Sequence, residues 1–183
     1  MTEKKRQVPA IVHRETVART RIFQVEQLDL RFSNGAETRY ERLVGSAHGA
    51  VLVVPVLDGD TVLMIREYAA GVHRYELALP KGRVEAGESL LEAANREMME
   101  EVGYAARRLR HLTSLTLAPG YLSHTTHVIL AEDLYPQRAE GDEPEPIEVV
   151  PWPLARLGDL LACEDCTEAR SIAALFMVKE ALS

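Results

Sequence analysis

The chain has 183 residues and a mass of 20.4 kDa, the size of one compact domain that can bury a substantial hydrophobic core. Its hydrophobic fraction of 46% and charged fraction of 27% indicate neither a disordered nor a fibrous class. The formal net charge of -7 and the sequence pI near 5.4 argue against nucleic acid as a partner, because binding its backbone requires clustered Lys and Arg.

The amino-terminal segment carries Lys4, Lys5 and Arg6, but no apolar run follows them. No stretch approaches the roughly 18 apolar residues that a membrane span requires, so we expect a cytoplasmic protein with no membrane partner. Cys163 and Cys166 form one C-x-x-C motif, which could be half of a zinc site or a redox pair. Without a second pair of ligands, we expect two reduced thiols.

The first part of the chain predicts strands. Apolar residues partly alternate from 21 to 32, Asn34-Gly35 favours a turn, and an extended pattern resumes over 37–44, so we expect a β-hairpin. A buried strand over 50–57 and a second strand over 61–68 follow, joined by an Asp-Gly-Asp turn. We expect residues 1–47 to form an amino-terminal arm with this hairpin, and residues 48–183 to form the main domain.

Between Ser89 and Gly103 the pattern becomes helical. Ser89 and Glu92 fit a capping box, and Gly103 is a natural helix stop. One apolar stripe with spacings of three and four is expected to pack on the core. It consists of Leu91, Ala94, Met98 and Val102.

The second half predicts two strands, over 109–117 and 126–134, followed by helices over 151–161 and 167–182. The expected buried side of the last helix consists of Ile172, Leu175, Phe176 and Val178. Strands and helices in this order suggest an α/β fold in which helices cover a mixed or mostly antiparallel sheet.

The predicted helix at 89–103 carries a concentration of acidic residues. On an ideal helix, Glu100 and Glu101 lie about 60° and about 40° to either side of Glu97, so the three carboxylates share one exposed face. Like charges at these spacings destabilise a helix, and a bound cation would remove that cost. Hard oxygen ligands suit Mg²⁺ or Mn²⁺. The alternative is a solvated surface helix with Arg96 as the counter-charge.

The wider spacing decides between these alternatives. The chain reads Gly82, five residues, Glu88, seven residues, Arg96-Glu97-Met98, one residue, Glu100-Glu101, one residue, Gly103-Tyr104. This pattern resembles the signature of the Nudix hydrolases, G-x5-E-x7-R-E-U-x-E-E-x-G-U, in which U is a bulky apolar residue. The only departure is Tyr104 in the last apolar position.

The resemblance implies an α/β/α sandwich with a mixed sheet and a divalent-metal-dependent hydrolase of diphosphate linkages. It implies that Glu97, Glu100 and Glu101 bind Mg²⁺ or Mn²⁺, with the Lys81 carbonyl as a further ligand. By the same resemblance, Arg96 orients the glutamates and Glu88 supports the loop or the metal shell.

Further residues resemble the ADP-ribose pyrophosphatase-like subgroup, and within it enzymes that act on ADP compounds. Pro119 lies fifteen residues after Tyr104, where ADP-ribose-type members carry a proline that shapes the nucleotide pocket. Similar runs include Arg14 to Arg19, Ile65 to Tyr68, Ala93 to Glu97, and Asp133 to Pro146. The resemblance implies hydrolysis of ADP-ribose, diadenosine triphosphate and NADH, with AMP as one product. The motifs of zinc-ribbon nicotinamide-dinucleotide pyrophosphatases and of coenzyme A diphosphatases are absent.

By this resemblance, the substrate-binding residues come from the hairpin, from the strands before the box and from the loop after it. They are Glu41, Arg42, Arg66, Glu76, Leu77, Ala78 and Pro119. The polar members among them could instead be ordinary strand-face residues. ADP-ribose pyrophosphatases also place a general base on a mobile loop, which matches the acidic stretch 140–148. We assign this role to Glu143, although the sequence does not decide which glutamate of the loop acts.

Three further expectations concern single features. His124 and His127 form an H-x-x-H motif outside a helix, for which we expect a structural or surface role. Trp152 could stack on a base, but between two prolines it is expected to anchor a turn. Because the arms of ADP-ribose-type relatives pack across a two-fold axis, the resemblance implies a homodimer.

Two alternatives from other classes remain. A non-catalytic Nudix-fold module that senses ADP-ribose would usually lack glutamates of the box and carry a DNA-binding domain. A scaffold protein would use the acidic helix only as a surface. Metal-dependent turnover of ADP-ribose distinguishes the enzyme from both.

Overall fold

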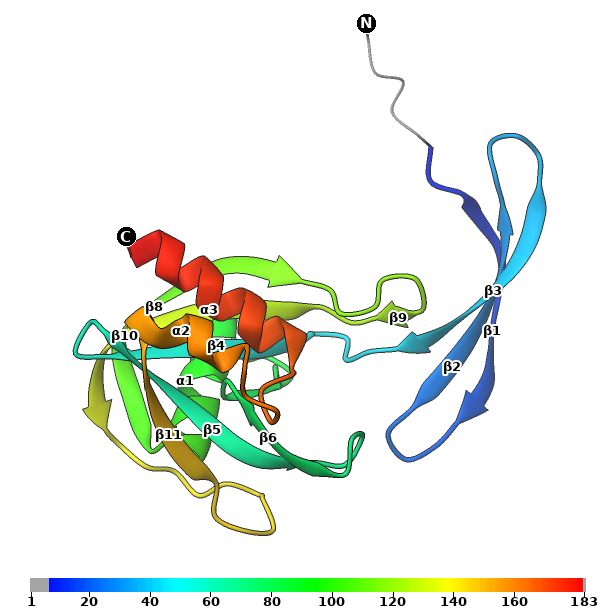
Figure 1. The fold of residues 1–183 in the computed structure, drawn as a ribbon. Coiled ribbons are helices and arrows are strands. Elements are labelled where there is room, and N and C mark those ends of the chain that lie inside the picture. Colours follow the sequence, from blue (N-terminus) through cyan, green and yellow to red (C-terminus); the bar gives the residue numbers. More distant parts are fainter. Residues whose placement is uncertain (1–6, 183) are drawn as a thin grey trace, which may run out of the picture. The chain divides into compact units, whose positions relative to one another are not determined.

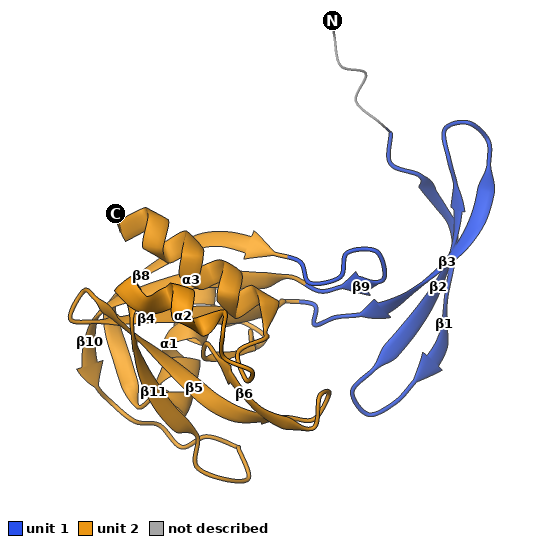
Figure 2. Cartoon of the chain, viewed as in Figure 1, with its two compact units in different colours: residues 1–47, 116–124 blue, residues 48–115, 125–183 orange. Residues whose placement is uncertain are grey.

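The computed structural model describes residues 7–182 and divides into two compact units (Figure 2). The first unit comprises Met1–Ala47 and Thr116–His124, and the second comprises His48–Leu115 and Thr125–Ser183. The basic residues Lys4, Lys5 and Arg6 lie outside the described residues.

The first unit is a four-stranded sheet in the order β1-β2-β3-β9 (Figure 1). Its strands are β1 (Ala10–Arg19), β2 (Gln24–Arg31), β3 (Glu37–Val44) and β9 (Leu122–Ser123). The pairs β1/β2 and β2/β3 are antiparallel, and β9 runs parallel to β3. Gly35 has a φ of 84° and the Asn34 side chain accepts from the Ala36 N–H at 3.0 Å. The expected hairpin is therefore confirmed as β2 and β3.

Strand β1 was not predicted from the sequence. Every residue of β1 is exposed, so its apolar residues Ile11, Val12 and Val17 do not alternate with a buried face. The strand is fixed instead by its hydrogen-bonded ladder to β2, which has two register shifts. Such pairing leaves no periodic signal in the sequence.

The second unit contains a seven-stranded mixed sheet. Its path is β11-β5-β4-β10-β8, with β6 paired to β5 and β7 paired to β4, and only the β4/β10 pair is parallel. The strands are β4 (Ala50–Leu57), β5 (Thr61–Ala69), β6 (Arg74–Ala78), β7 (Lys81–Arg83), β8 (Tyr104–Leu115), β10 (Thr126–Pro136) and β11 (Glu148–Pro153). The predicted strands at 50–57, 61–68, 109–117 and 126–134 are confirmed as β4, β5, β8 and β10.

Helices cover both faces of this sheet (Figure 1). On one face, α1 (Leu90–Glu101) packs on a cluster that includes Val51 and Val53. On the other face, α2 (Leu157–Leu160) and α3 (Ala169–Leu182) pack on Leu52 and Val54. Alternate residues of β4 thus face opposite layers, as the two-residue period of a strand requires. The predicted α/β/α sandwich with a mixed sheet is confirmed.

Helix α1 begins and ends as the sequence predicts. The Ser89 hydroxyl accepts from the Glu92 N–H at 3.3 Å, and the Glu92 carboxylate accepts from the Ser89 N–H at 2.9 Å. After the helix, Gly103 has a φ of 81°, a conformation that favours glycine. One member of the predicted apolar stripe is wrong, because Leu91 is exposed while Ala93 is buried.

The prediction of a helix over 151–161 is wrong at its start. Glu148–Pro153 forms β11, paired antiparallel with β5, and a short 3-10 turn, η1 (Leu154–Arg156), leads into α2. Prolines are tolerated in β11 because it lies at the edge of the sheet and needs fewer backbone donors. The Trp152 indole N–H donates to the Arg156 carbonyl at 3.0 Å, so the expected anchoring of a turn is confirmed.

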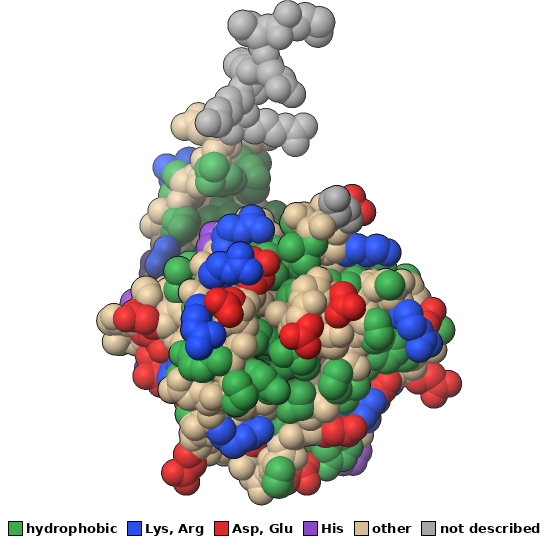
Figure 3. All heavy atoms as spheres, turned by 90° about the vertical axis from the view of Figure 1, so that its left-hand side faces the viewer, with side chains coloured by type: hydrophobic (Ala, Val, Ile, Leu, Met, Phe, Trp, Pro, Cys, Tyr) green, Lys and Arg blue, Asp and Glu red, His purple; other side chains and the backbone are tan. Residues whose placement is uncertain are grey.

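The predicted last helix is confirmed as α3. Of its expected buried side, Leu175 and Val178 are fully buried, while Ile172 and Phe176 are partly buried against the same cluster. None of the helices within residues 7–182 combines the length and apolar character needed to cross a membrane. On the face seen in Figure 3, acidic and basic side chains lie intermixed with hydrophobic ones.

Candidate active site

Helix α1 places its glutamates against the sheet rather than in open solvent. Glu97 is 8% exposed and Glu101 is 4% exposed, whereas Glu100 is partly buried. The expectation that these carboxylates lie on an exposed helix face is therefore wrong for two of the three residues. The reason is that α1 packs on β4, β7 and β8, so its acidic face meets the strand that precedes it.

Arg96 holds three of the carboxylates together. Its Nε and Nη2 donate to the two oxygens of Glu88 at 2.9 and 3.1 Å. Its Nη1 donates to Glu97 at 2.7 Å and to Glu100 at 3.1 Å. Nη2 also donates to the Arg83 carbonyl at 3.0 Å, which ties the helix to the end of β7. A planar guanidinium with five donors suits this arrangement, and a lysine could not replace it.

The glycine at the start of the box has a steric role. A Cβ on Gly82 would overlap the carboxylate of Glu97. Only a residue without a side chain allows this glutamate to approach the backbone of β7 so closely.

Lys81 joins two further carboxylates, those of Glu101 and Glu67, to the cluster. Its backbone N–H donates to Glu101 Oε2 at 2.9 Å. Its Nζ pairs with Glu67 Oε2 at 2.9 Å, across from β7 to β5. Lys81 therefore lies between the box glutamates and the residues at the end of β5.

Burial and hydrogen bonding shift the pKa values of these groups. Desolvation raises the pKa of Glu101 to about 8, although Lys81 opposes the shift. Desolvation also raises the pKa of Glu97, against the effect of Arg96. The hydrogen bond from Arg96 lowers the pKa of Glu88, and hydrogen bonding to Glu88 raises the pKa of Arg96. Two buried carboxylates with raised pKa values are groups that a nearby cation would favour in the ionised form.

The donor set of the cluster fits a hard divalent cation. Glu97, Glu100 and Glu101 share one side of α1 and offer carboxylate oxygens, and position 82 has no side chain to fill the space beside Glu97. Arg96 and the Lys81 N–H engage these oxygens here. In this arrangement, no group of three or more His, Cys, Asp or Glu residues among residues 7–182 is set around one ion position. Binding a cation there would require the carboxylates to turn away from Arg96.

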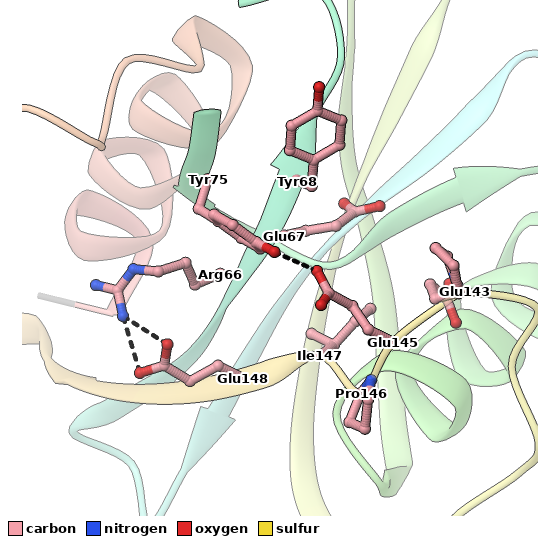
Figure 4. Close-up of a pocket in the computed structure, with 10 residues that line it drawn as sticks. Arg66, Glu67, Tyr68, Tyr75, Glu143, Glu145, Pro146, Ile147 and Glu148 are labelled. Carbon is pink, nitrogen blue, oxygen red and sulfur yellow. Dashed lines mark hydrogen bonds and ion pairs between the residues drawn. The ribbon is translucent and has the colours of Figure 1, made fainter. Parts of the chain in front are cut away.

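An acidic loop lies beside this cluster. A Cβ on Gly141 would meet both the Glu143 carboxylate and, at 3.8 Å, Cβ of Glu100. Further along the loop, Glu145 accepts from the Tyr75 hydroxyl at 2.5 Å, and Glu148 accepts from Arg66 Nη1 with both oxygens at 2.8 Å (Figure 4). The Glu143 carboxylate makes no hydrogen bond or ion pair within residues 7–182.

The loop and the ends of β5 and β6 enclose a pocket of about 370 Å³ (Figure 4). Its lining includes Arg66, Glu67, Tyr68, Tyr75, Glu143 and Ile147. The pocket contacts the carboxylate cluster through Glu67, which pairs with Lys81.

Family models match both units of the chain. The model described as the NudE-type Nudix hydrolase N-terminal domain matches residues 9–42. The NUDIX domain model matches residues 46–172, which include the whole carboxylate cluster and the acidic loop.

The chain belongs to the Nudix hydrolase family.

Similar proteins agree with this assignment. Over 177 residues, the Nudix hydrolase described here is 50% identical to the ADP compounds hydrolase NudE of Escherichia coli, covering 97% of this chain and 95% of that protein. It is 30% identical to an ADP-ribose pyrophosphatase of Bacillus subtilis, with 92% of this chain and 95% of that protein covered. A crystal structure of an ADP compounds hydrolase superposes with a TM-score of 0.91 at 49% identity, covering 98% of this chain and 97% of that chain.

Nudix hydrolases generally need divalent metal ions, which agrees with the donor set. All the box glutamates are present, so the alternative of a non-catalytic sensing module is not favoured. The alternative of a purely structural acidic helix does not explain why Glu97 and Glu101 are buried.

The structure separates the predicted substrate-binding residues into three groups. Arg66 lines the pocket of the second unit. Glu41, Arg42 and Pro119 line a separate pocket of about 210 Å³ in the first unit, together with Tyr121. In that pocket Arg42 donates to Glu26 at 2.8 Å.

The third group is the strand segment Glu76, Leu77 and Ala78, which is buried. Leu77 and Ala78 are 1% and 3% exposed, so their side chains are out of reach of a ligand. Glu76 accepts from Arg74 at 2.5 Å and from the Thr167 N–H at 3.2 Å. Although burial opposes it, these hydrogen bonds lower the pKa of Glu76. Its carboxylate fastens β6 to the segment before α3.

Other residues singled out from the sequence lie away from the carboxylate cluster. His127 and His111 both contact the Ser114 hydroxyl, at 2.9 and 3.1 Å, on strands β8 and β10. Cys163 and Cys166 are free thiols, and burial raises the pKa of Cys166 to about 11.

Sequence reasoning did not assign a role to Tyr75 or to the side chain of Lys81. Tyr75 stands in a short strand whose first two residues are exposed and whose last three are buried, so its pattern gives no sign of a pocket. The Lys81 side chain belongs to the site only because β5 positions Glu67 to pair with it. That contact joins residues 14 positions apart and has no local signal.

Proposed function

We propose that this Nudix hydrolase cleaves the diphosphate linkage of ADP-linked compounds and releases AMP. The candidate substrates are ADP-ribose, diadenosine triphosphate and NADH. The observation that carries the proposal is the complete cluster in which Arg96 gathers Glu88, Glu97 and Glu100 beside buried Glu101. The substrate class is supported by the 50% identity to the Escherichia coli ADP compounds hydrolase over nearly the whole chain.

In this proposal, Glu97, Glu100 and Glu101 hold Mg²⁺ or Mn²⁺ with the Lys81 carbonyl. A divalent cation there supplies charge neutralisation at the phosphoryl oxygens and lowers the pKa of a nearby water. The carboxylates bind the cation. The positive charge of the bound cation then lets this acidic protein accept a polyanionic substrate.

Arg96 and Glu88 position the ligands. Arg96 contacts Glu97 and Glu100 with one nitrogen and is itself fixed by both oxygens of Glu88. When the carboxylates turn toward a cation, the two hydrogen bonds to Glu88 keep the guanidinium in place. Held in this way, Arg96 limits the orientations that Glu97 and Glu100 can adopt.

Glu143 is the proposed general base. Its carboxylate lies in the loop next to Gly141, beside Glu100, and has no partner within residues 7–182, whereas Glu145 and Glu148 are engaged by Tyr75 and Arg66. It takes a proton from the attacking water as the new oxygen–phosphorus bond forms. The bond to the bridging oxygen breaks, and that oxygen leaves with the second product.

Substrate contacts are proposed for Arg66 in the second unit and for Glu41, Arg42 and Pro119 in the first. Because Glu76, Leu77 and Ala78 are buried, we propose that they support the site through their backbone. We also propose that the protein is a cytoplasmic homodimer, in which the amino-terminal sheet contributes to the dimer contact.

Product chromatography tests the substrate class. Purified protein is incubated with Mg²⁺ and, in separate reactions, ADP-ribose, diadenosine triphosphate, NADH and dATP. We expect AMP from the three ADP compounds and slow turnover of dATP, because a triphosphate offers binding energy on one side only. Faster hydrolysis of dATP than of all three ADP compounds rejects the proposal.

A further inference from the structure

The pocket beside the acidic loop, which we name the tyrosine pocket, has two aromatic rings in its wall. Tyr68 lies at the end of β5 and Tyr75 at the start of β6, and both line the cavity of about 370 Å³ (Figure 4). Pro144, Pro146 and Ile147 of the loop complete the apolar part of the lining. A volume above about 300 Å³ is within the range of pockets that hold small organic ligands.

The two rings are exposed although they are large and apolar. Tyr68 is 45% exposed and Tyr75 is 49% exposed. Their centroids lie 5.9 Å apart at an interplanar angle of 68°, so the rings meet edge to face. The Tyr75 hydroxyl is held by Glu145, and the Tyr68 hydroxyl contacts His73 Nδ1 at 2.6 Å. The rings are therefore fixed while their surfaces are available for a ligand.

The tyrosine pocket adjoins the carboxylate cluster at two places. Glu67, in the pocket lining, pairs with Lys81, whose N–H binds Glu101. Glu143, also in the lining, lies against Gly141, beside Glu100. A substrate whose diphosphate lies at the cluster can therefore place one of its ends in the pocket.

The charges of the pocket select against an anionic group. Four glutamates line it, and its single arginine, Arg66, is already paired with Glu148 at 2.8 Å and Asp165 at 3.0 Å. A phosphate would be repelled by this lining. A neutral planar ring with an amino or amide N–H₂ would stack on tyrosine and donate to a carboxylate.

We propose that the tyrosine pocket binds the second nitrogenous ring of a dinucleotide substrate, the ring on the half that does not become AMP. This inference rests on the proposed function. Substrates with a second ring, either a second adenine or a nicotinamide, would therefore gain binding energy from this pocket. ADP-ribose has no second ring, so the pocket gives it no stacking contact.

Two substitutions of Tyr75 test the inference. Tyr75→Leu removes the ring, whereas Tyr75→Phe keeps the ring and removes only the hydrogen bond to Glu145. The measured quantity is the ratio of kcat/KM for diadenosine triphosphate to kcat/KM for ADP-ribose. We expect Tyr75→Leu to lower this ratio by about tenfold and Tyr75→Phe to leave it within about twofold of the wild type.

Tyr135→Leu is the matched control, because Tyr135 on β10 packs against Arg107 of β8 and lines neither pocket described above. We expect the control to keep the wild-type ratio. Circular dichroism verifies that each variant folds, which is expected because the Tyr75 side chain is half exposed.

Two results overturn the inference. If Tyr75→Leu leaves the ratio unchanged, the ring does not serve the second half of the substrate. If Tyr75→Phe lowers the ratio as much as Tyr75→Leu, the contact with Glu145 is responsible rather than stacking. The proposed function fails separately, when the wild type releases no AMP from any of these substrates.

Discussion

Single contacts determine whether the carboxylates of α1 can work together. Glu97 fits against β7 only because position 82 has no side chain, and Glu101 is held by one backbone N–H of Lys81. Arg96 then fixes the remaining members at distances between 2.7 and 3.1 Å. Each of these contacts can be changed separately.

Gly82→Ala is expected to lower kcat/KM for ADP-ribose by at least about a hundredfold, because its Cβ displaces the Glu97 carboxylate by an ångström or more. Steady-state kinetics measure the loss. Gly71→Ala is the matched control, since a Cβ there meets no atom within 4 Å and Gly71 does not have a positive φ. Equal activity of the two variants contradicts the steric role of Gly82.

The pKa of Glu101 predicts a pH-dependent stability of the metal-free protein. The folded pKa of about 8 lies above the ordinary value of 4.5, so the folded state holds this proton more tightly than the unfolded chain. The resulting stabilisation is complete below pH 4.5 and is lost as the pH rises to about 8. In EDTA, the unfolding free energy of the wild type relative to Glu101→Gln should therefore fall between pH 5 and pH 8.

Urea denaturation of both proteins at several pH values measures this difference. Above pH 8 it should level off, and added Mg²⁺ should stabilise the wild type more than Glu101→Gln. A difference that rises with pH in EDTA would show that Glu101 is not buried as a proton-binding group.

The sequence was enough to identify the glutamates of the carboxylate cluster, but not how deeply they are buried or what they contact. The Nudix spacing pointed to Glu97, Glu100 and Glu101, because their positions on a helix follow from its 3.6-residue period. It did not reveal that Glu97 and Glu101 are buried, since burial depends on how closely β7 approaches α1. Contacts such as Glu67 with Lys81 also depend on how separate strands pair.

Helix α1 and strand β7, which precedes it, support the site. The capping box at Ser89 fixes the first turn, and Gly103 allows the chain to turn into β8. The cluster of Val51, Val53 and Met98 holds the helix against the sheet.

Ser89→Ala is expected to destabilise the protein by about 1 kcal/mol, which lowers Tm by roughly 2–4 °C. The variant loses the hydrogen bond that the Glu92 N–H donates to the Ser89 hydroxyl. Calorimetry measures the change, and Ser33→Ala, at an exposed position in the turn between β2 and β3, is the control. If both variants melt at the wild-type temperature, the capping box does not stabilise α1.

Elements with a periodic apolar pattern could be predicted from the sequence. Strand β4 matches its predicted bounds because it is buried on both faces, and α1 matches because caps mark both of its ends. Strand β1 could not be predicted because all of its residues are exposed. Residues 151–153, which end β11, were predicted to start a helix, because the pairing of β11 with β5 comes from the rest of the fold and leaves no local signal.

The amino-terminal unit presents an exposed surface that does not contribute to the core of the second unit. Its edge strand β1 is exposed along its length, and Ile11, Val12 and Val17 are each at least 45% exposed. An exposed edge with apolar side chains is a surface that another chain can cover.

A homodimer is expected from this surface. Sedimentation velocity at micromolar concentration should give about twice the chain mass of 20.4 kDa. Val12→Lys combined with Val17→Lys should shift the protein toward the monomer, because two charges then replace exposed apolar side chains of β1. A wild-type monomer with full activity would contradict this assembly.

The metal-binding role of the α1 carboxylates is tested most directly by the rate of AMP release from ADP-ribose by Glu97→Gln and Glu101→Gln in the presence of Mg²⁺. Each substitution removes one ligand charge and keeps the size of the side chain, so circular dichroism should show an intact fold. We predict that turnover falls by several orders of magnitude in both variants, while the wild type loses its activity in EDTA and regains it with added Mg²⁺. Wild-type turnover by either variant would contradict the assignment of the α1 carboxylates as the metal-binding centre.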